Sequence, residues 1–173
     1  MAGLLADLDL ALRELIAPVE RDAAAWGRAP AGKWSVGQHV EHVGHILAMG
    51  ATGFEKAADD LLRGDLGRRP WRDPIQALAV WVLTTRYPKG AKSPKPALPS
   101  PTPDRDQALA SIARGAVRHR ALTERLMPEQ IDRLWIRNPY APKLRWHYTF
   151  AEGLKVQAGH ARHHARAVRE AAG

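Results

Sequence analysis

The chain has 173 residues, 45% of them hydrophobic and 25% charged, which is the balance of a soluble globular protein. A chain of this length can bury roughly two-thirds of its unfolded surface, so we predict one domain spanning residues 1–173. It has no cysteine, which excludes disulfides, thiolate metal sites and a cysteine nucleophile. The formal net charge is +8, but the basic residues are scattered and form no nucleic-acid-binding motif, so no specific nucleic-acid partner is predicted.

A membrane location is not predicted either. The longest strongly apolar run, residues 75–85, falls short of the about 20 residues that a membrane-spanning helix needs. The apolar N-terminal stretch is interrupted by charged residues and is not preceded by a basic region, unlike a signal peptide. We therefore expect a cytoplasmic protein without a membrane partner.

Apolar residues recur at three- and four-residue spacing and predict a mostly helical chain. The four principal helices are expected near residues 3–25, 35–62, 104–126 and 148–171, with an accessory helix near 74–86. A short polar residue followed three positions later by Glu or Gln is typical of a helix start. This pattern opens four of the expected helices, at Ser35, Asp73, Asp104 and Thr149.

Two long connections separate the helices. Residues 87–104 hold six of the 13 prolines and are predicted to be largely non-helical, and residues 127–147 are predicted to hold at most one short helical turn. The number and length of the helices predict an all-α, antiparallel four-helix bundle with no β-sheet of consequence. The long crossovers favour a topology other than simple up-down-up-down.

Six of the eight histidines fall on two expected helices: His39, His42 and His45 on one, His160, His163 and His164 on the other. His160 and His164 lie on one side of the apolar stripe, roughly 6 Å apart along the axis, a spacing at which two imidazoles bind one metal ion. His163 faces away. Periodicity favours His39 or His42 as a third ligand over His45, without choosing between the two. Three neutral imidazoles would leave a coordination position open, as in catalytic zinc sites.

The two histidine-bearing segments are similar to a known family. Residues 33–43, KWSVGQHVEHV, resemble the Trp-Ser-(Val/Ile)-Gly…His-Leu signature of the DinB/YfiT-like superfamily, and residues 160–164, HARHH, resemble its C-terminal His-x-x-His-His segment. The resemblance implies an up-down-down-up four-helix bundle with a divalent metal site at His42, His160 and His164. It selects His42 over His39. The chain departs from the family at Ala167, where many members carry Gln.

Members of this family include S-transferases that use bacillithiol, mycothiol or glutathione, a mycothiol-dependent isomerase and metal-dependent hydrolases, and homodimers are common. The resemblance thus implies a metal-dependent enzyme acting on a small molecule, in which the ion activates a low-molecular-weight thiol or water. The alternative is a non-catalytic binding module with a structural or vestigial ion. Imidazole ligands favour zinc or nickel, and iron or manganese stay open. No residue beyond the ligands is assigned a catalytic role.

Three other residues near these motifs carry simpler expectations. Trp34 is expected to be a hydrophobic anchor at the start of its helix. Gln157 precedes His160 by one turn and is a candidate to support that ligand. Trp71 and Trp81 are expected to pack in the core or under loops.

Overall fold

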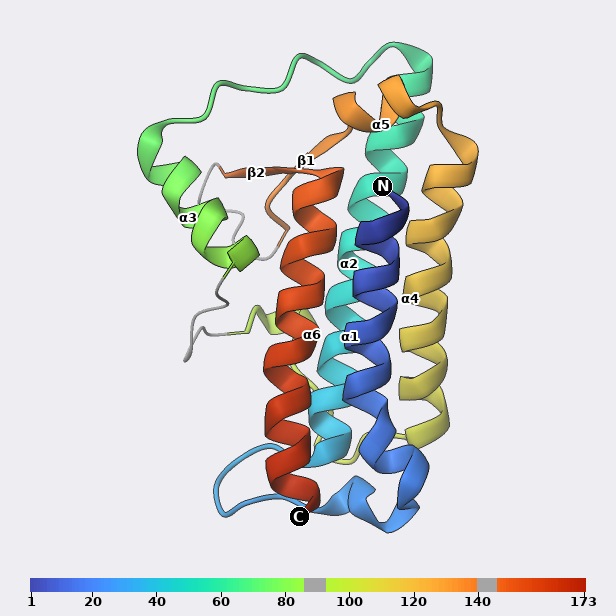
Figure 1. Ribbon diagram of the computed structural model, residues 1–173, viewed down its shortest axis with the longest axis vertical. Helices are drawn as coiled ribbons and strands as arrows, with labels where there is room; N and C mark the ends of the chain where they lie inside the picture. Colours follow the sequence, from blue (N-terminus) through green and yellow to red (C-terminus); the bar gives the residue numbers. More distant parts are fainter. Residues whose placement is uncertain (86–92, 140–145) are drawn as a thin grey trace.

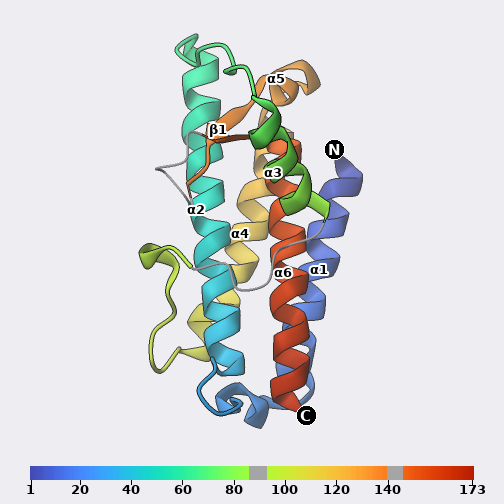
Figure 2. The same ribbon diagram turned by 90° about the vertical axis from the view of Figure 1, so that its left-hand side faces the viewer.

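The computed structural model describes residues 1–85, 93–139 and 146–173. As predicted, most of these residues are helical. Four long helices lie side by side (Figures 1 and 2): α1 (Ala2–Arg21), α2 (Val36–Arg63), α4 (Arg105–Arg125) and α6 (Phe150–Ala172). Figure 1 shows that α2 and α4 run in one direction along the long axis, and α1 and α6 in the other. The shorter helices are η1 (Ala23–Gly27), α3 (Pro74–Thr85), η2 (Lys95–Ala97) and α5 (Pro128–Arg133).

The core lies between the four long helices, because each turns one apolar stripe inward. A single cluster of buried side chains draws on all of them, including Leu15, Val43, Ile112 and Leu154. Fully burying one such aliphatic side chain contributes about 1.5–3 kcal/mol. In the described part of the chain, no helix is both long enough and apolar enough to span a bilayer.

All four predicted helix starts carry a side-chain cap, and two of them carry the full reciprocal arrangement. The hydroxyl of Ser35 accepts from the backbone N–H of Gln38 at 3.2 Å, and the Gln38 side chain accepts from the Ser35 N–H at 2.9 Å. Thr149 opens α6 with the same reciprocal arrangement. Asp73 and Asp104 each accept from the N–H three residues on, at 2.7 and 2.8 Å. These bonds satisfy backbone donors that have no partner within the helix.

The first helix ends earlier than expected, at Arg21 rather than near residue 25. Pro18 lies inside α1 and does not end it. The break comes at Asp22, which has an extended backbone and whose carboxylate accepts from the N–H of Ala24 at 2.9 Å. That side-chain bond starts the separate 3₁₀-helix η1. Asp side chains often accept from nearby backbone N–H groups in this way, and such bonds compete with continuation of the α-helix.

Two short strands occupy the connection for which no sheet was predicted. β1 (Trp135–Arg137) pairs antiparallel with β2 (His147–Thr149), with Ile136 opposite Tyr148. The pair leads directly into α6, because the N–H of Phe150 donates to the carbonyl of Leu134 at 3.1 Å. The expected short helical turn in this connection is α5. Residues 140–145 of this connection lie outside the described residues. So do residues 86–92, which comprise the last residue of the predicted accessory helix and the start of the proline-rich connection.

Helix α3 lies outside the four long helices, against the N-terminal half of α6 (Figure 1). Just before it, the guanidinium of Arg72 donates to both carboxylate oxygens of Glu152, at 2.7 and 2.8 Å. The opposite face of this segment is open: Trp71 is 80% exposed and Trp81 61% exposed. The expectation that these two tryptophans pack internally is therefore wrong: among the described residues α3 packs mainly on α6, and Trp81 on α3 and Trp71 just before it both face outward.

Candidate metal centre

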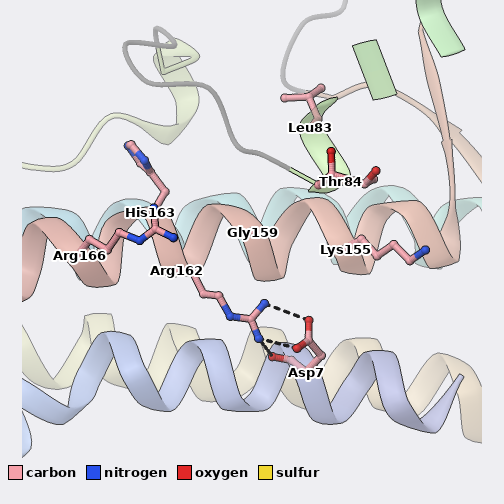
Figure 3. Close-up of a pocket in the computed structure, with 9 residues that line it drawn as sticks. Asp7, Leu83, Thr84, Lys155, Gly159, Arg162, His163 and Arg166 are labelled. Atoms are coloured by element: carbon pink, nitrogen blue, oxygen red, sulfur yellow. Dashed lines mark hydrogen bonds and ion pairs between the residues drawn. The ribbon is translucent and has the colours of Figure 1, made fainter. Parts of the chain in front are cut away.

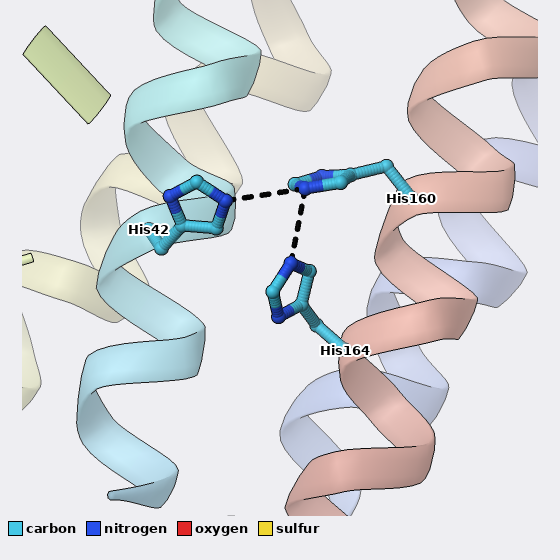
Figure 4. A group of neighbouring side chains, drawn as sticks. All are labelled: His42, His160 and His164. Atoms are coloured by element: carbon cyan, nitrogen blue, oxygen red, sulfur yellow. Dashed lines mark hydrogen bonds between the residues drawn. The ribbon is translucent and has the colours of Figure 1, made fainter. Parts of the chain in front are cut away.

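Three histidine side chains from two helices converge inside the bundle (Figure 4). His42 comes from α2, and His160 and His164 from α6. The Nε2 atom of His160 lies 3.2 Å from Nε2 of His42 and 3.0 Å from Nε2 of His164. The three side chains are only 2%, 4% and 7% exposed. In the described part of the chain, no other trio of His, Asp or Glu side chains converges in this way.

The antiparallel course of α2 and α6 brings these residues level with one another. His42 lies two turns into α2, while His160 lies at the middle of α6 and His164 one turn further on. The i, i+4 spacing puts His160 and His164 on one face. On α6 the neighbouring buried positions are small, with Ala161 and Ala165 both fully buried. These small side chains let α6 pack closely on its neighbours on either side of the two histidines.

Burial keeps these imidazoles neutral. Desolvation is the largest effect on each ring, and the positive charge of neighbouring histidines acts in the same direction. Together they lower the pKa of His160 to about 3 and also lower the pKa of His164. The pKa of His42 is lowered too, because burial outweighs its backbone hydrogen bond. Neutral rings retain a nitrogen lone pair, which is the form that binds metal ions.

The donor spacing matches the requirement of a small divalent ion. Zinc–nitrogen bonds of about 2.0–2.1 Å at tetrahedral angles place two ligand nitrogens about 3.3 Å apart. The nitrogen–nitrogen distances at His160 are 3.2 and 3.0 Å. Three imidazole nitrogens gathered in this way, with no carboxylate in the trio, are a donor set that suits a divalent cation. These residues therefore suit the ion that the fold family implies.

The segment before α4 covers one side of the cluster. The carbonyl oxygen of Ala97, in η2, lies 2.6 Å from Nδ1 of His42. Two residues of α2 hold this segment through Ser100: the carboxylate of Glu41 accepts from its backbone N–H at 2.5 Å, and Gln38 donates to its carbonyl at 3.1 Å. The Glu41 carboxylate is thus engaged in holding the segment, away from the three imidazoles.

Trp34 has a larger role than that of a hydrophobic anchor. Its ring centroid lies 5.0 Å from that of His42 and 6.1 Å from that of His164, with the latter pair nearly parallel. Gly37, one turn later, allows the close approach of Trp26, because a Cβ at this position would lie 2.5 Å from the Trp26 ring. The tryptophan of the signature therefore packs against His42, and its glycine lets the start of α2 pack closely on Trp26.

The other histidines of the two helices take different places. Nδ1 of His39, the ligand candidate that periodicity left open, lies 2.8 Å from Nδ1 of His164. His45 does not belong to the trio. His163, expected to face away, lines a separate pocket of about 350 Å³ on the outer side of α6 (Figure 3). There the guanidinium of Arg162 is paired with the carboxylate of Asp7, at 2.5 and 3.1 Å.

Two expectations about neighbouring residues had different outcomes. Gln157 does not support His160, since its amide nitrogen lies 3.1 Å from Nε2 of the buried His119 on α4. Sequence spacing missed this partner because it comes from another helix. Ala167 borders a pocket of about 270 Å³ that Trp34 and His39 also line. The small side chain at this position leaves open a space beside His39 that a longer residue would reduce.

The protein is thus mostly helical, and it carries a candidate three-histidine metal centre between α2 and α6. The family model of the DinB superfamily matches residues 6–168. The chain therefore belongs to the DinB superfamily. Neither a curated protein nor a solved structure gives a significant match to it.

Proposed function

We propose that this protein is a metal-dependent enzyme in which His42, His160 and His164 hold one divalent ion, zinc or nickel. The observation that carries the proposal is the convergence of three buried Nε2 atoms, two pairs of them 3.2 and 3.0 Å apart. The four long helices are assigned to the up-down-down-up bundle that family membership implies, and we expect a homodimer.

An ion bound by three neutral ligands keeps its full charge and lowers the pKa of a thiol or a water molecule bound beside it. The protein residues orient and shield this position. The Ala97 carbonyl fixes the ring of His42, and Trp34 packs against the imidazoles and excludes water from that side. A nucleophile must reach the centre from a co-substrate or from solvent, because the chain has no cysteine.

The proposed reaction is transfer of a low-molecular-weight thiol to a small electrophile, and hydrolysis is the second form of the same chemistry. In both, an ion held by His42, His160 and His164 would favour the deprotonated nucleophile; its proton would pass to solvent, and the group displaced from the electrophile would leave as an anion or take a proton from solvent. The competing function is a binding module in which the ion is structural. Trp34 and the pocket beside Ala167 support a small-molecule site, since they form a partly apolar space of about 270 Å³ beside His39, which contacts His164.

The test combines metal analysis with activity measurements on protein purified without a histidine tag. We expect one divalent ion per chain, and turnover of an electrophile with bacillithiol, mycothiol or glutathione, or of an ester or amide. The His164→Ala variant should lose both the ion and the activity, whereas His163→Ala, which removes an adjacent imidazole outside the trio, should keep both. A metal-loaded protein inactive in every panel, or activity that survives in His164→Ala, would refute the enzymatic proposal.

A further inference from the structure

We propose that His39 is a positioning residue for the metal centre: its Nδ1 accepts a hydrogen bond from Nδ1 of His164. This bond holds His164 in the tautomer that presents the Nε2 lone pair to the other two histidines. The positioning role assigned to His39 rests on the proposed metal-binding function. The hydrogen-bond argument itself concerns the protein alone and starts from a backbone carbonyl.

The first step fixes the tautomer of His42. The carbonyl oxygen of Ala97 can only accept a hydrogen bond, and it lies 2.6 Å from Nδ1 of His42. Nδ1 must therefore carry the hydrogen. A neutral imidazole has one N–H, so Nε2 of His42 has a lone pair.

The second step fixes the position of the hydrogen on His160. Its Nε2 lies 3.2 Å from Nε2 of His42, and both are buried. Two lone pairs facing each other at this distance would repel without compensation from water, so Nε2 of His160 carries the hydrogen. The same N–H faces Nε2 of His164 at 3.0 Å, which is therefore also an acceptor.

The third step reaches His39. Because Nε2 of His164 accepts, the single hydrogen of His164 lies on Nδ1, which is 2.8 Å from Nδ1 of His39. His39 must then accept at Nδ1 and carry its own hydrogen on Nε2. In this assignment each of the four contacts contains one hydrogen, because the Nε2 hydrogen of His160 is shared between His42 and His164. If His39 donated instead, His164 would carry its hydrogen on Nε2, pointing at the N–H of His160.

The consequence for metal binding is that two ligands are preset. His42 and His164 already present their Nε2 lone pairs, held by the Ala97 carbonyl and by His39. Only His160 has to give up its Nε2 hydrogen to complete the donor set. Hydrogen-bond partners of this kind typically contribute 10- to 100-fold in metal affinity. His39 would thus contribute to affinity without itself binding the ion.

The test uses two substitutions of equal size. Asn in the His39→Asn variant carries an acceptor oxygen close to the place of Nδ1, whereas Leu in His39→Leu has the same shape and no acceptor. His45→Leu, which removes an imidazole from the same helix, is the control. Two measurements apply: the tautomer of His164 from ¹⁵N NMR of the metal-free protein, and the zinc dissociation constant from competition with a chelator.

We expect His164 to be protonated on Nδ1 in the natural protein, in His39→Asn and in His45→Leu. His39→Leu should show a mixture of tautomers and a zinc affinity weaker by roughly 10- to 100-fold. Unchanged affinity and tautomer in His39→Leu, or equal weakening in His39→Asn, would overturn the inference. So would a cobalt absorption spectrum that loses a ligand in His39→Leu, since His39 would then be a ligand. A natural protein that binds neither zinc nor nickel would refute the proposed function, and the tautomer measurement would still decide the role of His39.

Discussion

Acid should destabilise the metal-free protein well above the pH at which carboxylates titrate. Six histidines have a lowered pKa in the folded protein, in each case first because of burial: His39, His42, His119, His147, His160 and His164. The pKa of His39 falls to about 4 and that of His160 to about 3, from an ordinary value of 6.5. Below pH 6.5 the unfolded chain therefore binds more protons than the folded one. Stability is complete above that pH and is lost as the pH falls.

The size of the effect follows from the two histidines with the clearest shifts. A shift of one pKa unit corresponds to 1.36 kcal/mol, so between about pH 7.5 and about pH 5 each histidine kept neutral removes about 2 kcal/mol of stability. His39 and His160 together account for about 4 kcal/mol. The other four histidines act in the same direction. Domains of this kind are stable by about 5–15 kcal/mol in total, so the loss is a large fraction.

The assay is urea unfolding followed by far-UV circular dichroism in the presence of a chelator, at both pH values. We expect the free energy of unfolding to be lower at the acidic pH by at least about 4 kcal/mol. Near neutral pH, zinc at 100 times its dissociation constant should add about 2.7 kcal/mol to the free energy of unfolding, and should add nothing in His160→Ala. If the metal-free protein kept its stability within about 1 kcal/mol over this range, the buried histidines would not be held neutral and the reasoning would fail.

Four single substitutions test other parts of the structure. His163→Ala should retain the ion and His164→Ala should lose it, as measured by metal analysis; the opposite result would reassign the ligands. Gly153→Ala should cost about 1–3 kcal/mol in urea unfolding, because the new Cβ would lie 2.6 Å from the ring of Phe54. Glu152→Gln removes an ion pair that, against the effect of burial, helps lower the pKa of this carboxyl to about 2. Hydrogen exchange in α3 should then be faster, and unchanged exchange would show that the ion pair does not hold this helix.

The helical part of the structure follows from local sequence signals. Periodic apolar residues and the caps at Ser35 and Thr149 act within a few residues, so they can be read directly from the chain. The strands β1 and β2 could not be predicted in the same way. Each has three residues, and their pairing joins segments about a dozen positions apart, so the stabilising contacts are non-local.

In the candidate site, too, the features that depend on local sequence could be predicted and those that depend on contacts between helices could not. A helical wheel places His160 and His164 on one face, and the family signature adds His42. Neither indicates what lies opposite that face. The Ala97 carbonyl has no sequence signature, and the contact of His39 with His164 depends on how α2 and α6 are aligned. The wheel left His39 and His42 as alternatives because both lie on the same side of α2; the structure gives them different neighbours.

The start of α2 links the family signature to the cluster, and this link can be tested through its cap. The Ser35→Ala variant loses the hydroxyl that accepts from the Gln38 N–H, at a cost of about 0.5–2 kcal/mol. The Gln38 side chain also holds Ser100, in the segment whose Ala97 carbonyl fixes His42. We therefore expect zinc affinity to fall by several-fold, below the roughly 10- to 100-fold loss typical of a direct hydrogen-bond partner.

The matched control is Thr149→Ala. It removes the same kind of reciprocal cap from α6, but at the end of the helix remote from His160 and His164. Both variants should lose similar stability in urea, and only Ser35→Ala should lose zinc affinity in the chelator competition. Equal losses of affinity would mean that the cap acts through overall stability alone. In that case the ordering of His42 would not depend on how α2 begins, and the physical account of the Trp-Ser signature given by these contacts would be wrong.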